Sequence, residues 1–197
     1  MRHMISGPKR ETANPGPPLS AEARKRFDTE VLPHIDAGYN LARHLMRDAQ
    51  DAEDAVQESC LRAIRHFAGF RGGDGRAWLL AIVRNACFTE LRRRRAAGER
   101  VVFDEEQHTE ADPTPGPEAD LDRVIAAGSL DAALAQLPVE FREALVLREL
   151  EEMSYKEIAQ ITGVPVGTVM SRLARARARL SRILGAAREE GVRDGLP

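Results

Sequence analysis

The sequence is poor in cysteine and in aromatic residues, and it contains no long apolar run. Its two cysteines, Cys60 and Cys87, are too few for a disulfide framework and are not spaced for a zinc site, so we expect two small buried side chains. No apolar stretch approaches the roughly 18 residues that span a bilayer, and the N-terminus lacks the apolar core of a secretion signal. We therefore expect a cytoplasmic protein with no membrane insertion.

The motifs of the common catalytic sites are absent as well. The sequence has no phosphate-binding P-loop, no GxSxG nucleophile elbow and no HExxH zinc motif, and its five histidines are scattered. We therefore predict a protein that is not an enzyme and that holds no cofactor and no metal ion.

Strand patterns are missing too, because apolar residues recur at intervals of three and four and rarely at intervals of two. With only three lysines, Arg supplies 26 of the 29 basic side chains, and Ala is frequent. A composition rich in Ala, Leu and Arg favours helices. The sequence therefore predicts an all-α protein.

The formal net charge of −2 conceals a segregation of charge along the chain. Four prolines near the N-terminus are typical of a disordered arm. Residues 104–122 hold eight acidic residues, three prolines and no Lys or Arg, which is typical of a flexible linker. We therefore divide the chain into a disordered arm (1–19), a first helical domain (20–96), an acidic linker (97–128), a second helical domain (129–184) and a tail (185–197).

The most regular amphipathic pattern of the first domain lies between residues 51 and 67. Seven residues spaced by three and four are expected to face the core: Ala52, Ala55, Val56, Cys60, Ala63, Ile64 and Phe67. On the opposite, polar face, Glu58 and Arg62 are spaced for an ion pair one helical turn apart. Before this helix, Pro33 is expected to divide the helical segment.

A further helix is expected from about Arg76 to Arg95, with Asp74 as its N-terminal cap. We expect one face of it to present Arg84, Asn85, Phe88, Arg92 and Arg95. Guanidinium groups bind phosphate, a ring stacks on bases and an amide reads base edges, so this face suits nucleic acid. An ordinary solvated basic face explains the same spacing equally well.

The second domain contains the strongest local pattern of the sequence. Ser154 and Glu157 have the spacing of a capping box, Gly163 ends a short helix, and another helix begins near Pro165 or Val166. Two short helices around a glycine-containing turn predict a helix-turn-helix, whose second helix enters the major groove. Six residues of that helix are expected to project outward: Thr168, Ser171, Arg172, Arg175, Arg179 and Arg182.

Two more helices, at 129–137 and 138–150, are expected to pack against the helix-turn-helix. Their acidic residues are expected to be exposed, which would keep this side off DNA and leave it free for protein: Asp131, Glu140, Glu143, Glu149, Glu151 and Glu152.

Motif blocks from both domains occur in a recognisable order: DAEDAVQESCLRAIRHF, RAWLLAIVRNACFTELRRRR and LPVEFREALVLRELEEMSYKEIAQITGVPVGTVMSRLARARARL. From about Phe27 to Leu184, the chain resembles the extracytoplasmic-function (ECF) sigma factors of the sigma-70 family of bacterial RNA polymerase. The resemblance implies a transcription initiation factor that binds core RNA polymerase, recognises minus-35 and minus-10 promoter elements and assists promoter melting. An anti-sigma factor is a further expected partner.

The resemblance also implies a role for each surface. Binding of the first domain to the β′ clamp is expected from Asp51, Asp54, Gln57, Glu58 and Arg62. Contacts with minus-10 DNA are expected from Phe70, Arg71, Arg76, Arg84, Asn85, Phe88 and Arg92. The second domain would dock on the β flap, and its expected minus-35 residues are Thr168, Met170, Ser171, Arg172, Arg175 and Arg179.

Several alternatives stay open at this stage. The linker either threads the nucleic-acid channels of the polymerase or is a solvated spacer between two weak binding sites. A free-standing helix-turn-helix regulator is the main alternative to a sigma factor, and it would bind duplex DNA tightly without polymerase. A helical adaptor for acidic proteins is the other, and a DNA-sequence-specific loss of binding on replacing Arg175 would exclude it.

Overall fold

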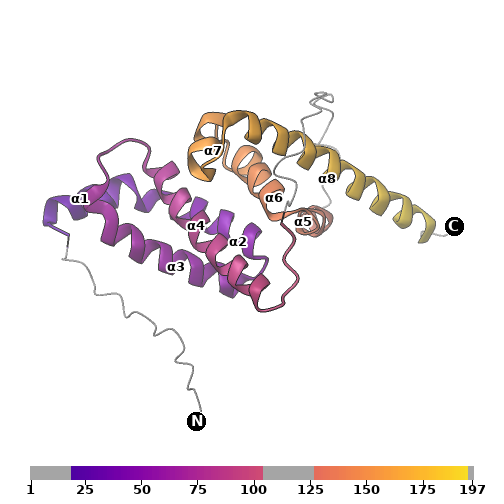
Figure 1. The fold of residues 1–197 in the computed structure, drawn as a ribbon, viewed down its shortest axis with the longest axis horizontal. Coiled ribbons are helices and arrows are strands. Elements are labelled where there is room, and N and C mark those ends of the chain that lie inside the picture. Colours follow the sequence, from indigo (N-terminus) through magenta and orange to yellow (C-terminus); the bar gives the residue numbers. More distant parts are fainter. Residues whose placement is uncertain (1–18, 104–126, 195–197) are drawn as a thin grey trace, which may run out of the picture.

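The computed structural model describes residues 19–103 and 127–194, and every regular element within these ranges is a helix (Figure 1). The prediction of an all-α fold with two helical domains is confirmed. Nearly all of the N-terminal arm, most of the acidic linker and the end of the tail lie outside the described residues. None of the described helices is both long enough and apolar enough to cross a bilayer.

The first domain is built from four helices and two short 3₁₀ turns. In chain order these are α1 (Ala21–Glu30), η1 (Leu32–His34), α2 (Ile35–Met46), α3 (Ala49–His66), η2 (Phe67–Gly69) and α4 (Gly75–Ala96). Pro33 lies in η1 and divides α1 from α2, as predicted. Asp74 caps α4 by accepting a 3.1 Å hydrogen bond from the Ala77 amide, which confirms the predicted cap.

The second domain contains the predicted helix-turn-helix. Its elements are α5 (Ala127–Ala135), α6 (Val139–Leu145), the π-helical turn η4 (Val146–Leu150), α7 (Tyr155–Thr162) and α8 (Val166–Asp194). Both hydrogen bonds of the Ser154–Glu157 capping box are present at the start of α7. Gly163 ends α7 with φ = 71°, a left-handed conformation that glycine adopts without steric cost.

The core of the first domain lies where α2, α3 and α4 pack on one another. Leu41, Leu45 and Leu80 are fully buried there, and burial of each such side chain contributes about 1.5–3 kcal/mol. Cys87 is buried as expected, and burial together with the charge of Glu143 raises the pKa of its thiol to about 12. Cys60 is only half-buried.

The prediction that Ile64 faces the core is wrong, because its side chain is exposed. The buried stripe of α3 follows Ala52, Val56, Ser59 and Ala63, and one further residue turns Ile64 by about 100° away from it. Ser59 joins this stripe because its hydroxyl donates to the Ala55 carbonyl and is thereby satisfied.

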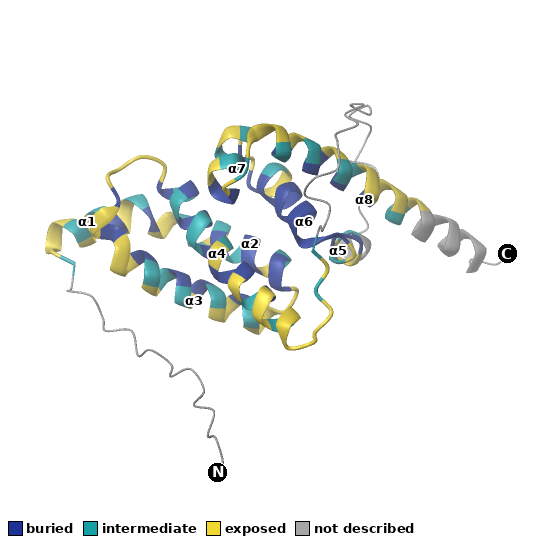
Figure 2. Ribbon diagram, in the orientation of Figure 1, coloured by how far each residue is buried: buried dark blue, intermediate teal, exposed yellow. Residues whose placement is uncertain are grey.

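Helix α6 is buried around its whole circumference (Figure 2). It packs against α8 of its own domain and also against α2 of the first domain, while α7 packs against α4. A helix that is covered on every side occupies the interior of a protein. The two domains therefore share an extensive contact, with α6 between them.

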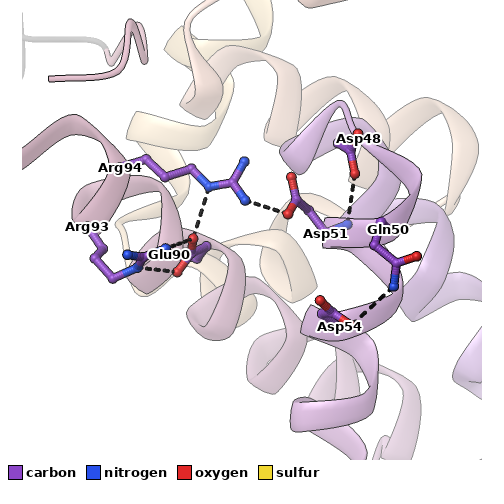
Figure 3. A network of polar contacts seen from close by, with 7 residues as sticks. All are labelled: Asp48, Gln50, Asp51, Asp54, Glu90, Arg93 and Arg94. Atoms are coloured by element: carbon purple, nitrogen blue, oxygen red, sulfur yellow. Dashed lines mark hydrogen bonds and ion pairs between the residues drawn. The ribbon is translucent and has the colours of Figure 1, made fainter. Parts of the chain in front are cut away.

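An ion-pair network joins the start of α3 to the end of α4 (Figure 3). The Arg94 guanidinium binds Asp51 at 2.5 Å and Glu90 at 2.9 Å, and Arg93 also donates to Glu90. These hydrogen bonds, led by the one from Arg93, lower the pKa of Glu90 to about 2. The arginine run at the end of α4 is thus anchored by carboxylates on both helices.

This network generates a prediction about acid stability. The lowered pKa of Glu90 stabilises the native state above the ordinary carboxyl pKa of about 4.5, and this stabilisation is lost as the pH falls toward 2. We expect Glu90→Gln to flatten the fall of the unfolding free energy between pH 5 and pH 2, measured by urea unfolding at each pH. The control is Glu53→Gln at an exposed position of α3, which should keep the wild-type dependence of the unfolding free energy on pH. If the wild-type protein and both variants show the same dependence on pH, the prediction is contradicted.

The first residue of α4 generates a second prediction. A Cβ atom on Gly75 would lie 1.9 Å from the carbonyl oxygen of Glu30, the last residue of α1. Since backbone must move to admit it, we expect Gly75→Ala to lower the unfolding free energy by about 1–3 kcal/mol in denaturant titrations. Gly69→Ala is the control, because nothing lies within 4 Å of its Cβ position. An unchanged or raised stability of Gly75→Ala would show that α1 and α4 are not in this close contact.

Candidate nucleic-acid and polymerase interfaces

The N-terminal part of α8 presents an exposed surface with little charge. Met170 is 54% exposed, and Val166 and Ala174 are exposed one turn to either side of it. Thr168 and Ser171 are half-buried beside them, with the Ser171 hydroxyl donating to the Thr168 carbonyl at 3.0 Å. The sequence analysis missed Val166 and Ala174, although their four-residue spacing from Met170 places all three on one helix face.

The prediction that Arg172 projects outward is wrong, because only 5% of this residue is exposed. It lies three residues after Val169 and four before Ala176, on the buried stripe of α8. Its positive charge acts on the buried carboxylate of Glu143.

Farther along α8, basic side chains line a groove of about 380 Å³. Arg175 and Arg179 lie in it together with Phe103 and Phe141, and the Arg175 guanidinium is 5.2 Å from the centre of the Phe141 ring. Arg179 and Arg182 are exposed, as predicted. The accessible basic side chains in this part of α8 thus begin at its third turn, with Arg175.

The basic face of α4 is only partly accessible. Asn85 and Arg92 are exposed, but only 13% of the Arg84 side chain is accessible. The Nε of Arg84 donates a 2.7 Å hydrogen bond to Glu143. The prediction that Phe88 projects outward is wrong, because it is 2% exposed. Phe103 returns after α4 to pack on the Phe88 ring, and the Arg84 guanidinium covers that ring at 4.0 Å.

The loop before α4 presents arginine and hides its aromatic ring. Phe70 is buried and stacks on Phe67 and Trp78, with ring centres 5.5 and 4.9 Å away, so it supports the loop from inside. Arg71 is exposed, whereas Arg76 is half-buried and donates to Glu151.

The polar face of α3 includes an apolar centre that the sequence analysis missed. Asp54 and Gln57 are exposed, and the predicted ion pair between Glu58 and Arg62 forms at 2.8 Å. Asp51 is half-buried and bound to Arg94. Within this charged surround, Leu61 and Ile64 are exposed by 50% and 41%. Exposed apolar side chains surrounded by polar ones are a common feature of protein-binding surfaces.

The prediction that the acidic residues near α6 are all exposed is wrong for three of them. Asp131, Glu149 and Glu152 are exposed, but Glu140, Glu143 and Glu151 are buried. For Glu143 and Glu151 the reason is the contact between domains, because the first domain supplies Arg84 to Glu143, and Asn40 and Arg76 to Glu151. Within the part of the chain that the structure describes, no cluster of three His, Cys, Asp or Glu side chains is suited to a metal ion.

Two family models match the two domains. The model for sigma-70 region 2 matches residues 31–97, and a model for sigma-70 region 4 matches residues 127–180. The second match contains the helix-turn-helix, and the first contains α3 and α4.

Characterised proteins and a solved structure are similar over most of the chain. The ECF RNA polymerase sigma factor SigE of Mycolicibacterium smegmatis is 36% identical over 80% of this chain and 61% of its own length. The ECF sigma factor SigM of Mycobacterium tuberculosis is 39% identical over 82% of this chain and 79% of its own length. The chain thus spans about three fifths of SigE and about four fifths of SigM.

The solved structure is that of the sigma factor RpoE in complex with the anti-sigma factor NepR from Bartonella quintana. It aligns with a TM-score of 0.63 at 29% identity and covers 82% of this chain and 98% of that one. The chain therefore belongs to the sigma-70 family and is an extracytoplasmic-function sigma factor, a non-enzymatic protein of the kind that directs RNA polymerase to promoters.

Proposed function

We propose that the chain divides promoter recognition between its domains, with residues 129–184 reading the minus-35 element and residues 20–96 binding polymerase and opening the minus-10 element. One observation carries this proposal: a helix-turn-helix with an exposed recognition helix and a second basic helix, α4, occur in one chain. A single duplex-binding module would need only the first of them.

For the minus-35 element, the exposed start of α8 suits the floor of the major groove. Met170 and Val166 offer apolar contact with thymine methyl groups, while Thr168 offers a hydroxyl to a base or a phosphate. Arg175 and Arg179 lie later in the helix, where side chains reach the phosphate backbone. Arg172 is buried and is therefore left out of our set of base-reading residues.

For the minus-10 element, the exposed residues Arg71, Asn85 and Arg92 are available to unpaired DNA. Guanidinium groups and an amide can hold phosphates and base edges of a single strand. Arg76 and Arg84 would join them once their bonds to Glu151 and Glu143 are released. Phe70 and Phe88 would act from the core, by holding the loop and the α4 face in shape.

For the polymerase, the α3 face with Leu61 and Ile64 among Asp54, Gln57 and Glu58 suits the β′ clamp. A protein interface of this kind combines an apolar centre with a charged rim. The second domain would dock on the β flap. Because the similar RpoE was solved with the anti-sigma factor NepR, we also propose an anti-sigma factor as a partner. A protein that acts on bacterial RNA polymerase works where the polymerase transcribes DNA, so we propose the cytoplasm as its location.

Run-off transcription tests the proposal. Bacterial core RNA polymerase is given sheared genomic DNA with and without the protein, and the 5′ ends are sequenced. We expect new start sites that share paired motifs near minus 35 and minus 10. If no new starts appear and the protein alone retains specific DNA duplexes, the protein is instead a free-standing regulator. If no new starts appear and the protein alone retains no specific duplex, it is an adaptor.

Two substitutions on α8 separate positioning from base reading. Arg179→Ala should lower transcription from all recovered promoters several-fold, because it removes one phosphate contact. For the same reason, the slope of the logarithm of the DNA-binding constant against the logarithm of salt concentration should fall in magnitude by about one. Met170→Ala should instead change the preferred minus-35 sequence. Arg24→Ala, at an exposed position on α1, is the control and should change neither. Identical behaviour of all three variants would contradict the assignment of α8.

A further inference from the structure

We propose that this protein inhibits itself: carboxylates of its second domain bind two of the arginines, Arg76 and Arg84, with which its first domain would contact minus-10 DNA. The inference rests on the proposed function of α4. We name the set of contacts the interdomain latch, and define it as Arg84 with Glu143, Arg76 and Asn40 with Glu151, and Arg142 with the Leu45 carbonyl.

The contact between Arg84 and Glu143 lies at the centre of the latch. The Glu143 side chain is fully buried, and Arg84 reaches it from α4 with a 2.7 Å bond. The second carboxylate oxygen of Glu143 has no hydrogen-bond partner among the described residues. A buried charge that loses its partner destabilises a protein strongly, so Glu143 favours the arrangement in which Arg84 is bound.

Glu151 extends the latch along the same face. Its Oε1 accepts a 2.6 Å bond from the Asn40 amide, and its Oε2 accepts a bond from Arg76. Asn40 belongs to α2 and Arg76 to α4, so one carboxylate of the second domain binds two helices of the first. Both arginines that Glu143 and Glu151 bind belong to the proposed minus-10 set.

In the third contact of the latch, the arginine belongs to the second domain and the acceptor to the first. This buried residue of α6 donates to the Leu45 carbonyl near the end of α2, at 3.4 Å, and to the Leu134 and Ala135 carbonyls at the end of α5. A cation is stabilised at a helix C-terminus by the helix dipole, and here one guanidinium serves two such ends. Its burial lowers its pKa to about 10, which leaves it charged at neutral pH.

The latched arrangement is incompatible with binding both promoter elements. Elements at minus 35 and minus 10 are separated by roughly 25 base pairs, on the order of 80 Å at 3.4 Å per base pair. In the structure α7 of the helix-turn-helix packs directly against α4. The domains must therefore separate on a promoter, and separation breaks the bonds of Arg84 and Arg76 across the interface.

Glutamine substitutions in the full chain test the latch. Glu143→Gln together with Glu151→Gln keeps the side-chain volumes but removes both charges. The matched control is Glu149→Gln together with Glu152→Gln, which changes the charge equally: Glu149 binds Arg177 of its own domain, and Glu152 is exposed. Glu151→Gln alone is a milder variant that leaves the buried pair intact and covers the case in which the double variant does not fold.

The first readout is the rate at which phenylglyoxal modifies Arg84, measured by peptide mass spectrometry against the exposed Arg92. In the wild-type chain we expect Arg84 to react about ten-fold more slowly than Arg92. In the latch variant, which carries both Glu143→Gln and Glu151→Gln, Arg84 should react about as fast as Arg92. The second readout is binding of a fluorescein-labelled single-stranded 30-mer of mixed sequence. The latch variant should bind it about ten-fold more tightly than the control variant. The milder variant should change Arg76 modification in the same direction.

Equal modification of Arg84 and Arg92 in the wild-type chain would overturn the latch, and so would a latch variant that behaves like its control. These outcomes differ from a failure of the proposed function, because the latter removes new start sites from wild-type transcription. Start sites without a response of the latch variant refute only the latch. A response without start sites supports the latch and refutes the promoter assignment.

Discussion

Glu143 brings a negative charge into the interior of the protein, and such a charge has to be met by a positive one. Burial raises the pKa of this carboxyl, whereas Arg84 and then Arg172 act to lower it. One of these arginines comes from the first domain and the other from the recognition helix. The contact between the two domains therefore depends on the ion pair of this carboxylate with Arg84.

The same chemistry connects this constraint with function. An arginine that binds phosphate also binds a carboxylate, because both offer paired anionic oxygens to its planar donors. The acidic residues around α6 thus occupy α4 in much the same way as DNA would. The α3 face with Leu61 and Ile64 and the start of α8 stay accessible in this arrangement. A partner that binds α3 can therefore reach the protein before the domains separate.

Features that depend on neighbouring residues in the chain could be predicted from the sequence. The division at Pro33, the Asp74 cap, the Ser154 capping box and the helix end at Gly163 each involve residues within one turn. The exposure of Phe88 and of Glu143 was predicted wrongly, since the residues that cover them, Phe103 and Arg84, lie farther away in the chain. The outward direction of Arg172 was also predicted wrongly. The position of Arg172 on the apolar stripe was visible in the sequence, but burial of an arginine is costly, so the residue type favoured the outward direction.

The distance between the domains tests the account most directly. Nitroxide labels at cysteines replacing Arg43 of α2 and Ala132 of α5, both exposed, report on the contact of these helices, and Cys60→Ser removes the half-buried native thiol. Pulsed electron spin resonance on the protein alone should give one short, narrow distance distribution, replaced by a longer one when core RNA polymerase and promoter DNA are added. A broad distribution in the protein alone, or a short one that persists in the promoter complex, would contradict the account.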